Sequence, residues 1–139
     1  MAVEIADVMT PRPLTMSPDA PVTEAASAMR DADVGDVLVV RGKDLLGIVT
    51  DRDIAVRVVA DGQDPKSTTV GEISSKDVTA VSPDDDLDRA VSLMRDKALR
   101  RLPVVDSGQP VGIVSIGDLA VELDSTSALA DISAAPPNK

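Results

Sequence analysis

The sequence predicts an α+β fold of two pseudo-twofold-related β-α-β-β-α repeats that are packed sheet to sheet. The first observation is an internal repeat, because a shift of 65 residues aligns residues 5–57 with 70–122 without a gap. The second is that β-branched runs and amphipathic stretches follow one another in the same order in both copies. The third is size: a copy of about fifty residues buries too little apolar surface to fold alone, so the copies must pack together.

Matching residues along both copies identify the repeat as a duplication. Ser17-Pro18-Asp19 falls on Ser82-Pro83-Asp84, and Gly47-Ile48-Val49 falls on Gly112-Ile113-Val114. We therefore assign copy one to residues 1–62, a polar linker to 63–69 and copy two to 70–124. The remaining residues, 125–139, are small, polar and proline-containing, which predicts a partly disordered tail.

Each copy is expected to begin with a short strand, near residues 14–16 and 78–81, followed by an amphipathic helix. Pro21 and the acidic run 84–86 lie where these helices should start, since proline suits the first turn and carboxylates suit the positive end of the helix dipole. The apolar positions of both helices recur at i, i+3, i+4 and i+7: Val22, Ala25, Ala26 and Met29 in copy one, and Leu87, Ala90, Val91 and Met94 in copy two.

A β-hairpin and a second helix complete each copy. Two β-branched runs are separated by turn-forming residues, which predicts hairpins from strands 37–40 and 45–50 in copy one and 102–105 and 111–115 in copy two. Helices are expected directly after them, over residues 51–60 and 116–123.

Composition excludes several function classes. The chain has no Cys and no His, so a zinc site of ordinary type, a thiol nucleophile and an imidazole base are absent, and no nucleophile–base constellation is legible. Its formal net charge of −10 and its lack of aromatic residues disfavour nucleic-acid binding, which depends on clustered cations and stacking surfaces. No apolar run approaches the roughly eighteen residues of a membrane span, and no signal peptide is recognised, so we expect a cytoplasmic protein without membrane partners.

The clearest polar positions within this apolar pattern lie where the last strand of each copy meets the last helix. Thr50 and Ser115 end these strands, and Asp53 and Asp118 follow three residues later. One interpretation is a pair of helix caps resembling capping boxes. The other is a ligand site, in which the hydroxyl and nearby backbone N–H groups bind phosphate and the carboxylate binds a vicinal diol. The duplication copies caps as readily as sites, so both interpretations stay open.

These same segments carry a family resemblance. The runs VMTPRPLTMSPDAPVTEAASAMRDADVGDVLVV…LLGIVTDRDI and VTAVSPDDDLDRAVSLMRDKALRRLPVVD…PVGIVSIGDL resemble two CBS domains in tandem, a Bateman module. The resemblance covers residues 5–123. In overall size and in its TDRDI…DP linker, the chain is also similar to small stand-alone two-CBS proteins of the hypoxic-response type. The Cys and His residues of such relatives are missing here, so no redox or metal role is carried over.

The resemblance implies a regulatory module that binds adenosine-containing ligands in clefts between its repeats. The glycine-containing junction motif of the family contacts phosphate and ribose, which implies that Thr50 and Ser115 are phosphate-side donors and that Asp53 and Asp118 accept from the ribose. The strand before the first helix offers backbone groups to the adenine edge, and the start of the next strand adds an apolar wall. The implied nucleotide-binding residues are Thr15, Met16, Val37, Leu38, Thr50, Asp53, Thr79, Ala80, Arg100, Arg101, Leu102, Pro103, Ser115 and Asp118.

The two copies differ in charge next to this junction. Copy two has Arg100 and Arg101 where copy one has Gly35 and Asp36. A phosphate near Arg101 would gain a charge-assisted contact, whereas Asp36 would repel it. We therefore expect the copy-two site to be the better site for a phosphorylated nucleotide. The alternative is that both arginines are merely solvated residues at the start of a strand.

The sequence thus favours a non-catalytic sensor of AMP, ADP, ATP or S-adenosylmethionine that signals by conformational or oligomeric change. No cofactor is required, and whether Mg²⁺ accompanies the nucleotide is left open. The expected partners are the adenosine ligand, a second copy in a homodimer and an unidentified protein effector. The alternative function is a ligand-free protein-interaction module in which the Ser/Thr–Asp pairs are helix caps only, and enzyme activity comes third.

Overall fold

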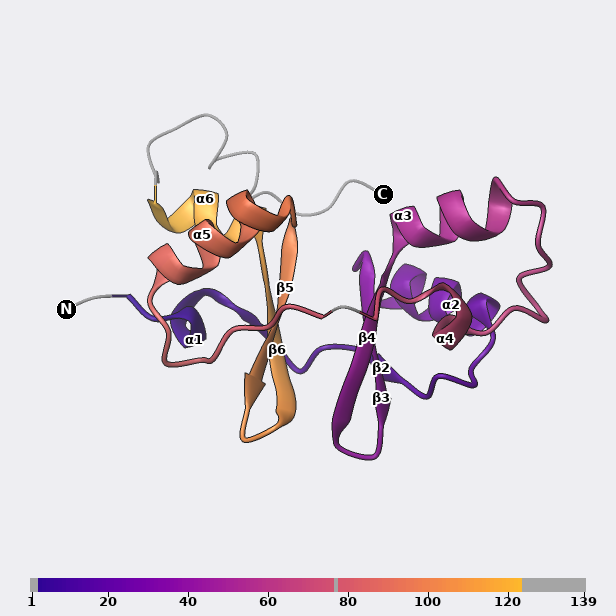
Figure 1. Ribbon diagram of the computed structural model, residues 1–139, viewed down its shortest axis with the longest axis horizontal. Helices are drawn as coiled ribbons and strands as arrows, with labels where there is room; N and C mark the ends of the chain where they lie inside the picture. Colours follow the sequence, from indigo (N-terminus) through magenta and orange to yellow (C-terminus); the bar gives the residue numbers. More distant parts are fainter. Residues whose placement is uncertain (1–2, 77, 124–139) are drawn as a thin grey trace. The chain divides into compact units, whose positions relative to one another are not determined.

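The computed structural model describes residues 3–76 and 78–123, which divide into two compact units (Figure 1). Unit 2 runs from Pro13 to Val78, and unit 1 combines the residues up to Arg12 with those from Thr79 onward. The units therefore do not coincide with the sequence copies 1–62 and 70–124. The first segment of each copy belongs to the unit that contains the hairpin of the other copy. The boundaries of the two sequence copies stay a prediction. The predicted tail, 125–139, lies outside the described residues.

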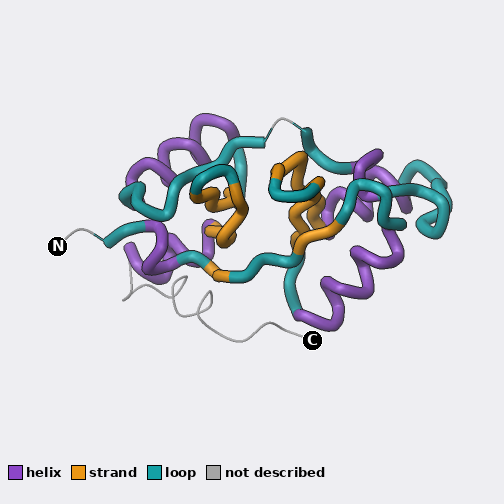
Figure 2. Tube along the Cα trace, turned by 90° about the horizontal axis from the view of Figure 1, so that it is seen from below, coloured by secondary structure: helices purple, strands orange, loops and turns teal. Residues whose placement is uncertain are grey.

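Unit 2 holds a three-stranded sheet in the order β2-β3-β4, with β2 parallel to β3 and β3 antiparallel to β4. Its helices lie against the sheet (Figure 2). In chain order its elements are β2 (Thr15–Met16), α2 (Val22–Ala32), β3 (Asp36–Arg41), β4 (Asp44–Thr50), α3 (Asp51–Ile54), the π-helix η1 (Ala55–Val59) and α4 (Val70–Ile73).

Unit 1 holds the sheet β1-β6-β5, in which all pairings are antiparallel. Its elements are α1 (Ile5–Val8), β1 (Thr10–Pro11), α5 (Leu87–Lys97), β5 (Arg101–Asp106), β6 (Gln109–Ser115) and α6 (Ile116–Leu123). The predicted hairpins and helices of both copies are thus present. The strand expected at 78–81 is reduced to one parallel bridge, between Val81 and Val104.

Both cores are aliphatic and are built by the predicted helical periodicity. Val22, Ala25 and Met29 of α2 are buried in unit 2, and their counterparts in α5 are buried in unit 1. Ala26 was expected on the same face but is exposed, so the buried stripe of α2 is narrower than the pattern suggested. Both helices end on a residue in the left-handed conformation, Asp33 and Ala98, at equivalent positions of the repeat.

The first segment of each copy, which we call its lead-in (residues 4–11 and 69–76), completes the core of the other unit. In unit 1, the Ile5 N–H donates to the Asp85 carbonyl at 2.9 Å. In unit 2, the Val70 N–H donates to the Ala20 carbonyl at 2.8 Å. These two bonds are related by the 65-residue shift, and Ile5 and Val70 are both fully buried. The duplication therefore folds by exchange of its two lead-ins.

Two glycines allow the lead-ins to approach the hairpins closely. A Cβ atom built on Gly47 would lie 2.8 Å from the carbonyl oxygen of Ser75, and one built on Gly112 would lie 2.9 Å from that of Thr10. Both distances are shorter than carbon–oxygen contact permits, and both obstacles are backbone atoms. Glycine is therefore required at these two positions by the backbone of the exchanged segment.

We expect Gly47→Ala and Gly112→Ala each to lower the free energy of unfolding by about 1–3 kcal/mol, since overpacking forces the backbone to shift. Urea unfolding monitored by circular dichroism measures this. Gly42→Asn is the matched control, because Gly42 has nothing within 4 Å and asparagine tolerates its positive φ. Alanine variants as stable as the control would contradict the close approach.

The exchange also predicts which sheet each lead-in protects. Ile5→Ala should speed native-state hydrogen exchange mainly in β5 and β6, and Val70→Ala mainly in β3 and β4, because each truncation opens a cavity in the unit that holds the side chain. Exchange measured by mass spectrometry on peptides from each hairpin checks this. The reverse pattern, with each variant loosening the hairpin of its own sequence copy, would show that the lead-ins are not exchanged.

Candidate functional site

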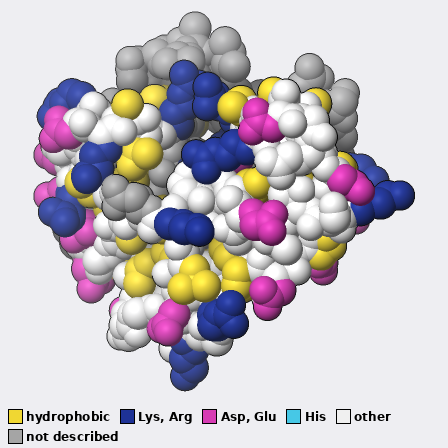
Figure 3. All heavy atoms as spheres, turned by 45° about the vertical axis from the view of Figure 1, so that its right-hand side comes forward, with side chains coloured by type: hydrophobic (Ala, Val, Ile, Leu, Met, Phe, Trp, Pro, Cys, Tyr) yellow, Lys and Arg dark blue, Asp and Glu magenta, His cyan; other side chains and the backbone are white. Residues whose placement is uncertain are grey.

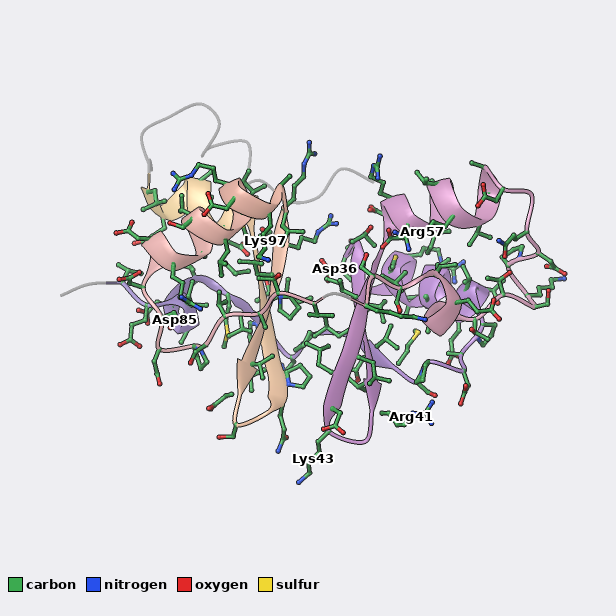
Figure 4. The ribbon with its side chains drawn as sticks, in the orientation of Figure 1. Asp36, Arg41, Lys43, Arg57, Asp85 and Lys97 are labelled. Carbon is green, nitrogen blue, oxygen red and sulfur yellow. The ribbon has the colours of Figure 1, made fainter. Side chains whose placement is uncertain are left out.

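In copy one, the junction of β4 and α3 is built by a reciprocal pair of hydrogen bonds. The backbone N–H of Thr50 donates to Oδ2 of Asp53 at 2.8 Å, and the backbone N–H of Asp53 donates to Oγ1 of Thr50 at 3.2 Å. Thr50 has extended backbone geometry, so it ends the strand and caps the helix at once. Both residues are partly buried. The side chains of this unit are drawn in Figure 4.

The copy-two junction repeats this arrangement without change. The N–H of Ser115 donates to Oδ2 of Asp118 at 2.8 Å, and the N–H of Asp118 donates to Oγ of Ser115 at 3.2 Å. Both pairs are therefore capping boxes, with Asp in place of the more usual Glu or Gln. The cap uses each hydroxyl as an acceptor and one oxygen of each carboxylate. The hydroxyl proton and the second carboxylate oxygen are not consumed by it.

The other implied residues of copy one lie in the same sheet as Thr50. Thr15 is paired with Leu38 on the neighbouring strand, and Val37 is paired with Val49, one residue before Thr50. Thr15 is exposed and Met16 half-buried, whereas Val37 belongs to the unit-2 core and Leu38 is fully buried as well. The structure thus brings these residues to one sheet, but positions 37 and 38 have no exposed side chain.

In copy two the pairing places Arg101 directly opposite Ser115, and Leu102 opposite Val114. Leu102 and Pro103 are buried. The Val81 N–H donates to the Pro103 carbonyl at 3.0 Å.

The pairing of Val81 with Val104 matches that of Met16 with Val39. The structural counterparts of Thr15 and Met16 are therefore Ala80 and Val81, one residue later than the pair Thr79 and Ala80 named above. The 65-residue shift relates Met16 to Val81 and Val39 to Val104, so Val81 could have been identified from the sequence.

The charge difference between the copies lies at the junction itself. Asp36 is paired with Thr50 in the same register in which Arg101 is paired with Ser115. Arg101 starts β5, and the carbonyl of Arg100, directly before it, accepts the N–H of Ile116 at 2.9 Å.

Lys97, which ends α5, adds a third cation shortly before them (Figure 4). Sequence reasoning did not single it out, although its repeat counterpart is the uncharged Ala32. On the face seen in Figure 3, dark blue Lys and Arg side chains lie among magenta acidic ones.

Over residues 3–76 and 78–123, no three His, Cys, Asp or Glu side chains are grouped so that they could hold a metal ion. In the same part of the chain, no helix is both long and apolar enough to cross a bilayer.

Known proteins resemble this chain over most of its length. The family model of the CBS domain matches twice, at residues 5–60 and 70–125. The CBS domain-containing protein YhcV of Bacillus subtilis is 43% identical over 133 residues, which cover 93% of this chain and 94% of the relative.

Two solved structures extend the likeness to three dimensions. Hypoxic Response Protein I, whose crystal structure holds two coordinated zinc ions, is 29% identical with a TM-score of 0.75, covering 86% of this chain and 98% of that one. A CBS domain pair solved with 5′-methylthioadenosine and S-adenosyl-L-methionine is 24% identical with a TM-score of 0.81, covering 91% and 100%. At that identity the second likeness concerns the fold alone.

The caps themselves can be tested without any ligand. Thr50→Ala and Ser115→Ala should each lower the free energy of unfolding by about 1 kcal/mol, because the backbone N–H of Asp53 or Asp118 loses the hydroxyl oxygen that accepts from it. Chemical denaturation measures the loss, and Thr50→Ser, which keeps the accepting oxygen, is the control. If the alanine variants unfold at the wild-type midpoint, the boxes do not stabilise the junctions.

Proposed function

This chain belongs to the CBS-domain family, and from that premise we propose that it is a non-catalytic regulatory module that binds an adenosine-containing ligand at its two strand-to-helix junctions. The ligand class is AMP, ADP, ATP or S-adenosylmethionine. Binding would change the conformation or the self-association of the protein and so be read by an effector. The homodimer, the effector and the cytoplasmic location stay predictions.

The observation that supports this proposal most is the repeated junction. Each copy presents one hydroxyl and one carboxylate in the same geometry, held by hydrogen bonds of 2.8 and 3.2 Å. A carboxylate oxygen accepts from the vicinal hydroxyls of a ribose, and a hydroxyl donates to phosphate. Because the side chains are already fixed by their caps, little conformational entropy is lost when a ligand engages them.

The neighbour solved with 5′-methylthioadenosine and S-adenosyl-L-methionine supports the ligand class at the level of the fold only. Two CBS repeats can accommodate adenosine compounds in that protein, but its identity to this chain is too low to transfer residues. The proposal for this chain therefore depends on its own junction residues.

Copy two is the better candidate for a phosphorylated ligand. Arg101 lies on the strand position opposite Ser115, where copy one has Asp36. An arginine there adds a charge-assisted hydrogen bond to phosphate, and an aspartate there repels it. A ligand without phosphate would discriminate less between the copies.

A catalytic role finds no support in the residues of the chain. It lacks Cys and His altogether, so catalysis would have to use carboxylates, Lys, Ser or Thr, and the junction side chains already serve as caps. The second candidate function is a ligand-free interaction module. It is favoured by one observation, namely that the capping boxes bond the backbone N–H groups of each junction without any ligand.

Thermal unfolding with ATP, ADP, AMP and S-adenosylmethionine, each with and without Mg²⁺, separates the two candidates. A ligand that binds only the folded state should raise the midpoint in a saturable way, by an amount that grows with its concentration above Kd. Asp118→Asn keeps a capping oxygen but loses the charge, and we expect it to weaken affinity about tenfold, the size of one charge-assisted hydrogen bond.

Arg101→Gln should lower the affinity for AMP and ATP but leave the affinity for adenosine nearly unchanged. Asp36→Asn is the control, because it removes a charge of the opposite sign. If none of these compounds shifts the midpoint at millimolar concentration, the sensor is refuted and the interaction module stands.

A further inference from the structure

Arg57 connects the copy-one junction to the lead-in of copy two. Its Nε atom lies 3.8 Å from Oδ1 of Asp53, the carboxylate oxygen that the capping box does not use. Its NH1 group donates to the backbone carbonyl of Ile73 at 3.1 Å, in α4. The Asp53 side chain is only 14% exposed, against 49% for Arg57, so the arginine lies on the solvent side of the carboxylate. Arg57 is labelled in Figure 4.

The segment that carries Arg57 differs between the copies. In copy one the helix after the junction changes to the π-helix η1, closed by the Ala60 N–H donating to the Ala55 carbonyl at 2.9 Å. In copy two the corresponding helix, α6, stays α-helical to Leu123. The residue that matches Arg57 is Glu122, an acid. π-Helical turns within longer helices are frequent at functional sites.

We infer that Arg57 is a positioning residue that couples occupancy of the copy-one site to the docking of α4. This inference rests on the proposed function of the same junction. Arg57 pairs with the Asp53 oxygen that the cap does not use and, through its bond to Ile73, ties that carboxylate to the lead-in. Copy two, with Glu122 at the matching position, lacks this coupling.

The coupling follows from one guanidinium serving two acceptors. A ligand that binds Asp53 competes with Arg57 for this carboxylate and so moves the guanidinium. When the guanidinium moves, its hydrogen bond to the Ile73 carbonyl changes as well. The coupling is reciprocal. If docked α4 raises the affinity for the ligand by some factor, the bound ligand favours the docking of α4 by the same factor. The lead-in of copy two follows directly on the linker, so ligand binding at the copy-one junction reaches the connection between the sequence copies.

The test measures hydrogen exchange at the α4 lead-in together with AMP affinity, in a chain carrying both Asp118→Asn and Arg101→Gln, which together weaken the copy-two site so that the copy-one site can be followed. The reporter is the Ser75 amide, which pairs with the Ile48 carbonyl at 3.0 Å. In the parent chain AMP should slow exchange at residues 70–76. Arg57→Gln should speed this exchange in the absence of ligand, abolish the slowing by AMP, and weaken AMP binding up to about fivefold, the range of an exposed charge pair.

Two further variants separate positioning from general effects. Arg57→Lys keeps the charge but cannot serve both acceptors with one planar group, so it should retain most of the affinity and lose the AMP-dependent slowing. Glu122→Gln, the matched change in copy two, should alter neither quantity.

If AMP binds the parent chain and Arg57→Gln keeps both the affinity and the slowing, the coupling is refuted while the proposed function stands. The same holds if Arg57→Lys behaves as the parent. If neither AMP, ATP nor S-adenosylmethionine binds the wild-type chain, the proposed function fails and the coupling fails with it.

Discussion

Both aliphatic cores of this protein depend on the docking of an exchanged lead-in against a hairpin that has a glycine at the point of contact. Gly47 and Gly112 leave space for the carbonyl groups of Ser75 and Thr10, and a side chain there would meet these backbone atoms as well as the side chains of Ser74 and Met9. Without α1 or α4 the corresponding core would expose the apolar face on which Ile5 or Val70 is buried. A copy of this size cannot replace that burial from its own residues, so the two copies depend on each other for folding.

The hairpins held in this way end at the two junctions, where structure and chemistry use the same atoms. Reciprocal hydrogen bonds between a hydroxyl residue and an Asp three positions later satisfy backbone groups that would otherwise lack partners at the start of a helix. The same bonds immobilise a hydroxyl and a carboxylate side by side. Stability accounts for the caps, and the remaining donor and acceptor are the groups that the proposed function assigns to a ligand.

Duplication gave the two junctions one backbone geometry and left their charges free to diverge. Asp36 and Arg101 occupy the same strand position, and Arg57 and Glu122 the same helix position. Copy one thus has an acid beside the hydroxyl and a cation beside the carboxylate, and copy two has the opposite signs at both places. Electrostatics of this kind changes which ligand is preferred more than it changes the fold.

The sequence alone determined the repeat, the hairpins, the helices and the identity of the capping residues, because periodicity and turn chemistry act over a few neighbouring residues. The family resemblance was legible for the same reason. Three features were decided only by tertiary structure: the exchange of the lead-ins, the exposure of Ala26 and the π-helical turn that carries Arg57. The exchange depends on contacts between segments distant in the chain, such as Ser75 on Gly47, and so does the bond from Arg57 to Ile73, because local patterns hold no information about such partners.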